Sequence, residues 1–398
     1  MAPSKEDEAA PFDATEDSDK SALLSLGDDE STADANLNKM SQALAIEGDE
    51  MIFCSACGKT GDDLKGCNGC RCIRYCSAAC QKKHWRTHKA ECKRIKAVLD
   101  GGERQPPVGQ YALDMAAPLS EEAIASGLFD NPPPTPDCPI CMVRLPVSSG
   151  TITYAPCCGK KICTACCYDN KKVFEKNNQK RADKMQAVLD YMPCPFCRAP
   201  RAKDNSDLIE RAKKRAEKDD PIANWMLATY LKNEDCATLV DHRAKTLHFI
   251  RRAADLGDND AQYTLARSHE EGEMGLKKDF NAARMLYEQS ARGGHALARD
   301  TLGHFDSETT FNRTTRSSVM HWRIAAAAGF SYALEYLLWS YEGGYIRHQD
   351  FAPSLRAMDK ALLEMKSESR DRYFELMRLS GKIKAGETVT SPVYNTPY

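Results

Sequence analysis

The chain has 398 residues, of which 18 are cysteine, and its 55 Lys and Arg residues nearly balance its 57 Asp and Glu residues. The N-terminal segment is acidic and has no apolar run behind a basic start, which excludes a secretory signal and argues against a transit peptide. No segment approaches the roughly 18 apolar residues needed to span a bilayer, so we expect no membrane association. We expect a protein of the cytoplasm, the nucleus or both, where cysteines remain thiols unless a metal binds them.

Both ends of the chain differ in composition from the rest. Residues 1–50 carry acidic runs at 6–8 and 28–30 and almost no aromatic side chains. Such a segment buries too little apolar surface to offset its conformational entropy, so we predict a disordered acidic region. Residues 382–398 are expected to form a flexible tail.

Residues 51–96, the first finger, contain two C-x2-C pairs, one C-x3-C pair and one H-x3-C pair. A C-x2-C turn points two sulfurs at one ion, and i,i+4 spacing places two side chains on one face of a helix. So short a segment cannot build a large core, so bound zinc would supply most of its folding free energy. The eight residues suffice for two tetrahedral zinc ions. They are Cys54, Cys57, Cys67, Cys70, Cys76, Cys80, His88 and Cys92.

Further residues of the first finger identify its resemblance. The step Tyr75-Cys76-Ser77, the residue Gln81 and the pairs His84-Trp85 and His88-Lys89 resemble a MYND zinc finger, and every ligand position of that family is filled. The resemblance implies that Cys54, Cys57, Cys76 and Cys80 hold one zinc, and that Cys67, Cys70, His88 and Cys92 hold the other. Cys72 is a competing candidate for the second ion, although the family spacing favours Cys70.

MYND domains are peptide-binding modules, and several take proline-containing segments into a groove beside the second zinc. The resemblance therefore implies protein partners and no catalytic residue. No SET-type signature accompanies the finger, which argues against a methyltransferase. Lysine and arginine residues crowd residues 82–96, but a solvated helix face explains them better than nucleic-acid binding, so we expect no nucleic-acid partner.

Residues 97–136 form a proline-rich linker, which we expect to be an extended spacer. One hypothesis is that its residues 132–136 dock into the MYND groove of the same chain.

Residues 137–200, the second finger, contain eight more candidate zinc ligands. Its opening Cys-Pro-Ile-Cys at 138–141 and its closing Cys-Pro-Phe-Cys-Arg at 194–198 resemble an all-cysteine RING domain. The resemblance implies one zinc held by Cys138, Cys141, Cys163 and Cys166, and another held by Cys157, Cys158, Cys194 and Cys197. Adjacent Cys157 and Cys158 reach one ion only through an unusual turn, so the assignment of Cys158 stays open.

The second finger also has a helical pattern between its last cysteine pairs. Within residues 167–193, the side chains of Phe174, Met185, Val188 and Leu189 are expected on a partly buried helix face.

RING ubiquitin ligases bind a ubiquitin-charged conjugating enzyme and hold its thioester in a reactive orientation, without a covalent catalytic residue. The resemblance assigns the contacts with that enzyme to Ile140, Pro195 and Arg198. The alternative is that Ile140 and Pro195 only stiffen the zinc loops and that the finger mediates assembly.

Residues 205–381 contain an internal repeat. The phrase Ala253-Ala254-x2-Gly257-x3-Ala261-x3-Leu265 returns from residue 290 and from residue 325, and in weaker form from residue 215. Small residues at this spacing allow close helix packing, and the glycine ends a helix, so we predict an α-solenoid. The phrase resembles Sel-one-like repeats, which bind proteins. We expect the aromatic residues Trp225, Tyr263, Trp322, Trp339 and Tyr341 in the core.

The whole sequence therefore predicts a mainly α fold, in which a disordered N-terminus and two cross-brace zinc-binding domains precede an α-solenoid. The favoured function is a RING-type ubiquitin ligase whose MYND finger and repeats bind substrates or partners. The alternative is a non-enzymatic, zinc-dependent scaffold. The two differ in whether Ile140, Pro195 and Arg198 form an exposed patch or are covered by the helix within residues 167–193.

Overall fold

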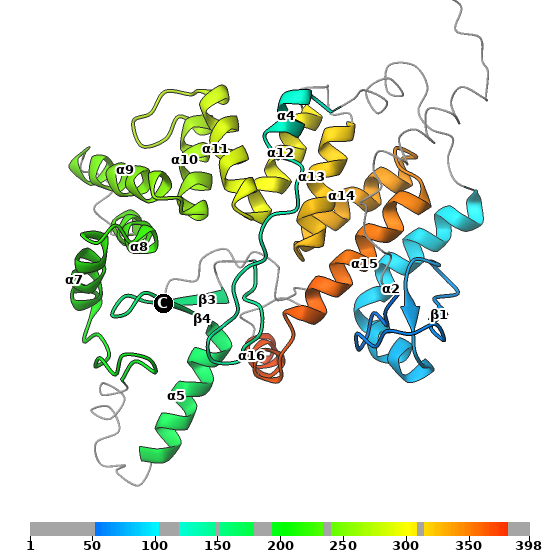
Figure 1. Ribbon diagram of the computed structural model, residues 1–398, viewed down its shortest axis with the longest axis horizontal. Helices are drawn as coiled ribbons and strands as arrows, with labels where there is room; N and C mark the ends of the chain where they lie inside the picture. Colours follow the sequence, from blue (N-terminus) through cyan, green and yellow to red (C-terminus); the bar gives the residue numbers. More distant parts are fainter. Residues whose placement is uncertain are drawn as a thin grey trace, which may run out of the picture.

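The computed structural model describes residues 52–102, 119–147, 151–178, 193–233, 240–308 and 314–380, and these are mainly helical, as predicted (Figure 1). The expected disordered region 1–50, the tail 382–398 and the residues Met185, Val188 and Leu189 lie outside these ranges. Within the described ranges, no helix is both long and apolar enough to cross a membrane.

Nine consecutive helices of the C-terminal half form an arch in which each helix packs against the next (Figure 1). This array confirms the predicted α-solenoid. Its helices are α7 (Asn205–Ala216), α8 (Pro221–Asn233), α9 (Val240–Asp255), α10 (Asn259–Glu271), α11 (Phe280–Arg292), α12 (Ala296–Glu308), α13 (Arg316–Ala327), α14 (Ser331–Glu342) and α15 (His348–Glu364).

The repeated phrase spans the turn within each helix pair. At the α9–α10 turn, the N–H groups of Gly257 and Asp258 donate to the carbonyls of Ala254 and Ala253 over 3.0 and 2.9 Å. The same two bonds recur in the other three copies. The first donor always has a positive φ, which favours glycine, although Asp219 occupies this position in the first copy. The φ angles are 56° at Asp219, 88° at Gly257, 95° at Gly294 and 95° at Gly329.

The core of the array follows the small and aromatic positions of the repeat. The methyl groups of Ala253, Ala261 and Ala333 are fully buried, which lets neighbouring helices approach closely. Trp322 and Tyr341 are buried as expected. Trp339 is instead 49% exposed, because it lies on the same helix face as the exposed residues Tyr332 and Glu335, seven and four positions before it.

Each finger contains a short antiparallel hairpin followed by a helix. The first finger contains β1 (Lys65–Gly66), β2 (Arg74–Tyr75) and α2 (Ala78–Gly101). The second finger contains β3 (Ile152–Ala155), β4 (Lys160–Cys163) and α5 (Thr164–Asn178). The first part of the helix expected within residues 167–193 is present as α5, which starts earlier, at Thr164, while residues 179–192 lie outside the described ranges.

The described parts of the linker are not a free spacer. Helix α2 continues to Gly101, a short helix α4 (Glu121–Ala125) follows, and residues 126–134 lie against the array. After the last helix of the array, the chain returns to the second finger, where α16 (Glu368–Leu379) packs against α5.

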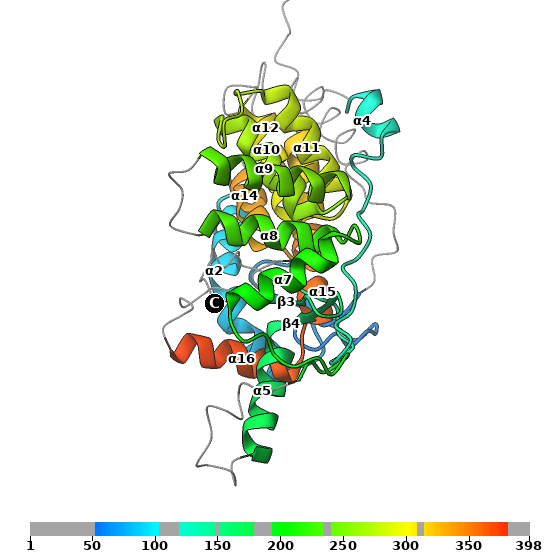
Figure 2. The same ribbon diagram turned by 90° about the vertical axis from the view of Figure 1, so that its left-hand side faces the viewer.

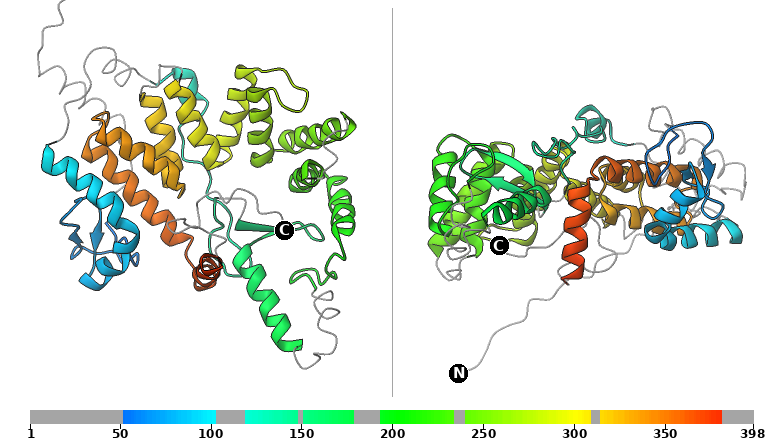
Figure 3. Two further views of the ribbon diagram at one scale, coloured as in Figure 1. Left: turned by 180° about the vertical axis from the view of Figure 1, so that it is seen from behind. Right: turned by 90° about the horizontal axis from the view of Figure 1, so that it is seen from below.

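The two fingers contact the array at different places. Helix α2 of the first finger packs against α14 at one end of the arch. The second finger lies in the mouth of the arch, where the phenol of Tyr154 donates to Asp220 near α7 and Arg372 of α16 pairs with Asp169 of α5. Figures 2 and 3 show this arrangement from the side, from behind and from below.

Candidate zinc centres

Four of the five C-x2-C sequences fold into the same backbone loop, whereas the fifth, Cys163 to Cys166, runs from the end of β4 into the first turn of α5. In each of the four, the residue after the second cysteine donates its N–H to the carbonyl of the first cysteine, over 2.8 to 3.1 Å. That residue has a left-handed conformation, which closes the loop and turns both sulfurs to one side. These residues are Gly58 (φ 76°), Arg71 (φ 56°), Met142 (φ 54°) and Arg198 (φ 60°).

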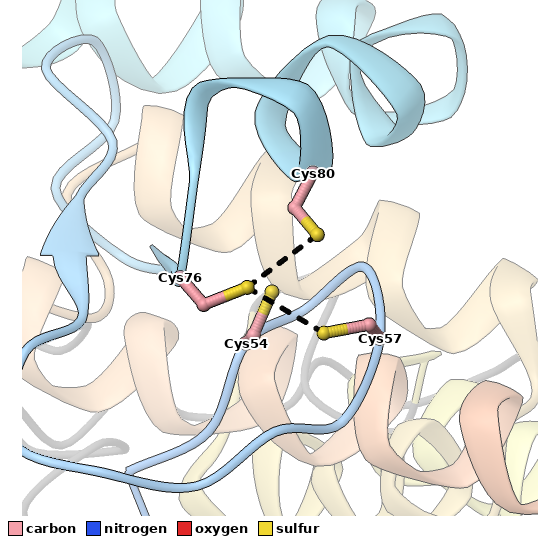
Figure 4. A group of neighbouring side chains, drawn as sticks. All are labelled: Cys54, Cys57, Cys76 and Cys80. Carbon is pink, nitrogen blue, oxygen red and sulfur yellow. Dashed lines mark hydrogen bonds between the residues drawn. The ribbon is translucent and has the colours of Figure 1, made fainter.

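The first group in the first finger joins a C-x2-C loop to the start of α2 (Figure 4). The ligand atoms of Cys54, Cys57, Cys76 and Cys80 all lie within 4.8 Å of one another. The sulfur of Cys76 is 3.7 Å from that of Cys57 and 3.5 Å from that of Cys80. Zinc–sulfur bonds of about 2.3 Å in a tetrahedron require sulfurs about 3.8 Å apart, so the geometry fits zinc.

The second group in the first finger is buried. It contains Cys67, Cys70, His88 and Cys92, again within 4.8 Å. The sulfurs of Cys67 and Cys92 are 3.6 Å apart, and Nε2 of His88 lies 3.3 Å from the sulfur of Cys70. A Cβ atom at Gly69 would lie 2.6 Å from the sulfur of Cys92, so only glycine leaves room for this group.

Cys72 lies outside both groups. Its buried thiol donates to the carbonyl of Cys70 over 3.2 Å and lies 3.2 Å from Nε2 of His348. The competing candidate for the second ion therefore packs against α15 of the array instead.

The second finger brings together the two groups that the sequence suggested. Cys138, Cys141, Cys163 and Cys166 form one, and Cys157, Cys158, Cys194 and Cys197 form the other, each within 4.8 Å. The adjacent pair lies in the tight turn between β3 and β4, where the N–H groups of Cys158 and Gly159 both donate to the carbonyl of Ala155. This turn carries the sulfur of Cys158 to 3.8 Å from that of Cys194.

The comparisons with known proteins bear on the first finger. The model of the MYND finger family matches residues 54–92. This segment is a MYND finger. A stretch of 61 residues of the chain is 43% identical to human histone-lysine N-methyltransferase SMYD3, covering 15% of this chain and 14% of that protein.

Two further proteins share a similarly short match. One is SET domain-containing protein 14 of Caenorhabditis elegans, 42% identical over 55 residues, covering 14% of this chain and 13% of that protein. The other is ubiquitin carboxyl-terminal hydrolase 19 of Arabidopsis thaliana, 38% identical over 74 residues, covering 18% of this chain and 10% of that protein. The chain thus covers only 10–14% of the length of these three relatives.

Among solved structures, the chain is similar to a Sel1 repeat protein from Oxalobacter formigenes, with a TM-score of 0.32, 23% identity and coverage of 53% of this chain and 80% of that chain. It is also similar to c5321, a protective antigen with an SLR fold from uropathogenic Escherichia coli, with a TM-score of 0.28, 18% identity and coverage of 54% and 53%.

The backbone of the MYND finger and of the second finger favours ionised cysteines. Burial alone would raise the pKa of Cys54, but backbone N–H groups of Cys76, Ala56 and Cys57 outweigh it and bring the pKa to about 7. The first cysteine of each other C-x2-C loop, Cys67, Cys138 and Cys194, has a pKa of about 7 for the same reasons. Thiolates are the form that binds zinc.

Several other cysteines of these groups have a raised pKa, Cys92 among them. Burial, followed by the charge of Cys70, raises the pKa of Cys92 to about 12. Four such side chains share one site as ligands only when a cation offsets their mutual repulsion. Charge and geometry therefore agree that the clusters are arranged to bind zinc.

The three candidate conjugating-enzyme contacts are all exposed. Ile140 is 41% exposed, and Pro195 and Arg198 are exposed as well. The described part of α5 does not bury them. Arg198 has a second feature that the sequence did not reveal, because it is the left-handed residue that closes its zinc loop.

One residue that contacts a zinc centre was missed by the sequence patterns. Arg370 of α16 is buried, and its guanidinium donates to the carbonyls of Arg144 and Val143 over 2.6 and 3.1 Å. It also lies 3.8 Å from the sulfur of Cys141. Arg370 is 229 residues away from Cys141 in the sequence, so no local pattern pointed to it.

Proposed function

We propose that the second finger is a RING-type ubiquitin ligase domain and that the MYND finger and the array bind substrates or partners. The general part of this proposal is that the protein binds zinc and binds other proteins. It is supported by the zinc-binding clusters, and by the MYND finger and the helical repeats, which are protein-interaction modules. The proposed zinc ligands are the sixteen residues of the four groups, two ions in each finger.

The observation that carries the ligase proposal is the exposure of Ile140 in a C-x2-C loop. The equivalent residues of the other loops are Ala56, Gly69 and Phe196, so the loop does not require a large aliphatic side chain. Phe196 packs against the core of the second finger, whereas Ile140 remains 41% exposed. Pro195 is also exposed, on the loop of Cys194 and Cys197. Exposed apolar side chains on zinc-bound loops can bind a conjugating enzyme and hold it in one orientation.

A proline-containing partner at the MYND finger is the second part of the proposal. Trp85 on α2 is 38% exposed, and its ring lies 6.5 Å from that of His88 in an edge-on arrangement. An exposed indole beside the second zinc group offers a flat apolar surface to a proline ring. Replacement of Trp85 by Ala is expected to weaken the binding of proline-rich peptides, measured by calorimetry, and to leave the zinc content unchanged.

A non-enzymatic scaffold remains the second candidate, and the docking of α16 favours it. Tyr373 packs against the core of the second finger, with its ring 5.6 Å from that of Tyr168, and Arg370 holds the first zinc loop. These contacts fix the second finger to the array, which an assembly role requires and a ligase role does not.

The test is ubiquitin discharge from a panel of charged conjugating enzymes to free lysine, using the zinc-loaded full chain. Ile140→Ala and Arg198→Asn are expected to reduce discharge at least tenfold, and Asn preserves the left-handed backbone at 198. The matched control is Met285→Ala, which truncates a side chain that is 63% exposed on α11 and should leave discharge unchanged. If no enzyme of the panel discharged ubiquitin above background, the scaffold function would be favoured.

A further inference from the structure

A segment of the linker is bound to the array in the manner of a peptide ligand. This segment, the strap, consists of residues 126–134 and runs from α4 across one face of the array towards the second finger (Figures 1 and 2). Leu128 is only 2% exposed and belongs to one buried cluster with Ala266, Tyr287 and Leu302, which lie on the three array helices α10, α11 and α12. The array therefore offers a pocket for one aliphatic side chain of the strap.

Arg299 of α12 recognises the backbone of the strap. Its fully buried guanidinium donates to the carbonyl of Leu128 and, over 3.3 Å, to that of Asp130. Within the described residues no carboxylate forms a hydrogen bond or ion pair with it, and its Nε has no hydrogen-bond partner. Burial and the neighbouring Arg292 lower the pKa of Arg299 to about 10. Among the residues that the structure describes, the oxygens that accept hydrogen bonds from this buried cation thus belong to the strap.

The remaining contacts of the strap define its chemistry. The ring of Phe129 lies 5.0 Å from that of His321, which is itself fully buried. The carboxylate of Asp130 is attracted to Arg299. Pro132 and Pro133 lie against Gly294, where a Cβ atom would be 3.5 Å from the carbonyl oxygen of Pro133. The prolines therefore lie against the array and not in the MYND groove, where one hypothesis had placed them.

We infer that the face of the array around Arg299 is a peptide-binding site, occupied in cis by the strap. It takes protein segments in which an aliphatic, an aromatic and an acidic residue follow one another in a turn, as Leu128, Phe129 and Asp130 do, and prolines come after them. Contacts to main-chain carbonyls do not require that the ligand belong to the same chain. A partner segment competes with the strap, whose covalent linkage gives it a high effective concentration. This inference goes beyond the proposed function and holds whether or not the second finger is a ligase.

The test measures binding of a fluorescent peptide with the sequence of residues 124–136 to the full zinc-loaded chain. The strap variant Leu128→Ala/Phe129→Ala is expected to bind this peptide at least tenfold more tightly than the unmodified chain does, because its own strap competes less. A peptide carrying the same two alanines is the matched control and should bind to neither protein. The inference would be overturned if the strap variant kept its helical structure and its zinc but bound the peptide of residues 124–136 as weakly as the double-alanine peptide.

A second measurement needs no substitution in the protein. A peptide with a photoreactive phenylalanine analogue at the position of Phe129 is added in excess to the unmodified chain. Cross-links are expected on α12 and α13, near His321, and an unlabelled peptide should suppress them. Cross-links spread over the chain, or absent from these two helices, would contradict the site. Neither measurement involves ubiquitin, so failure here is distinct from failure of the ligase assay.

Discussion

The two fingers use the same zinc-loop geometry, but they join the array in different ways. The MYND finger shares a core with the array, because buried Ile73, Tyr75 and Ile95 belong to one cluster with Leu338 and Phe351. The second finger keeps a core of its own, around Leu145, Ile162 and Ala165 and its zinc ligands, to which α16 adds Tyr373. The first is built into the solenoid, and the second is attached to it.

The polar contacts follow the same division. At the MYND finger, Arg356 donates to the carbonyl of Cys72 over 2.9 Å, beside the shared apolar core. At the second finger, the Tyr154–Asp220 hydrogen bond and the Arg372–Asp169 ion pair connect two surfaces with separate cores. Apolar burial couples the folding of two parts more strongly than exposed polar contacts do. We therefore expect zinc in the MYND finger to stabilise the array, and zinc in the second finger to act locally.

The largest effect is expected from removal of one proposed ligand in each finger. Cys92→Ser should remove a zinc that in such small domains contributes on the order of 10 kcal/mol to folding, and helices α14 and α15 should lose stability with it. Cys194→Ser should leave these helices unaffected. Hydrogen exchange of the two variants, with zinc content measured in parallel, checks this difference. Equal loss of protection in α14 and α15 in both variants would show that the fingers are not coupled differently.

A smaller effect is expected from Arg370, the main polar connection between α16 and the second finger. Arg370→Met removes donors from the carbonyls of Arg144, Val143 and Met365, and unpaired buried carbonyls should cost about 3 kcal/mol in total. The released α16 should become sensitive to protease while α14 and α15 stay protected. The control is Arg372→Ala, whose side chain is 57% exposed. If Arg372→Ala were equally destabilising, the attachment would not depend on the buried arginine.

Features of the molecule that depend on local spacing could be predicted from the sequence. The C-x2-C loops close through bonds between residues four apart, and the repeat turns through bonds over three to five residues, so both leave a pattern in the sequence. The interleaved pairing came from family resemblance instead. The turn that brings the sulfurs of Cys157 and Cys158 into one group contains Gly159, with a φ of 75°, but its geometry was not evident from two adjacent cysteines.

Contacts between distant segments could not be predicted. Cys72 meets His348 across 276 residues, and Arg299 meets Leu128 across 171. These pairs depend on the curvature of the array, which is the sum of small rotations at each helix pair. The prolines of the linker indicated an extended local conformation, and the sequence therefore predicted a free spacer. They carry no information on which surface the linker contacts.

A titratable group in the middle of the array provides a test of coupling that changes neither finger. Burial raises the pKa of Asp300 on α12 to about 7. The folded state then binds a proton more tightly than the unfolded state, so stability is highest at low pH and falls as the pH rises from about 4 to 7. Asp300→Asn should remove this loss, which amounts to about 1 to 2 kcal/mol between pH 5.5 and 7.5.

The rate at which a chelator removes zinc from each finger tests whether this substitution affects the two fingers differently. At pH 8 the stabilised array of Asp300→Asn should slow the loss of zinc from the MYND finger and leave the loss from the second finger unchanged. Unfolding by urea at both pH values gives the stability difference, and a zinc-sensitive dye gives the rates. A gain in stability that is the same at pH 5.5 and at pH 7.5 would show that Asp300 is not protonated in the folded array.

The smallest effect is expected at the ion pairs between the MYND finger and the array. Arg94 of α2 contacts Glu342 over 2.7 Å and Glu335 over 2.6 Å, but its side chain is 37% exposed. Arg94→Ala should therefore cost under about 1 kcal/mol, and 0.5 M NaCl should abolish most of the difference. The neighbouring Ile95 is fully buried in the shared core, so Ile95→Ala should cost about 3 kcal/mol, independently of salt. Urea unfolding at two salt concentrations measures both variants. If Arg94→Ala cost as much as Ile95→Ala, charge rather than apolar burial would join the MYND finger to the array, and the two fingers would be attached by the same kind of contact.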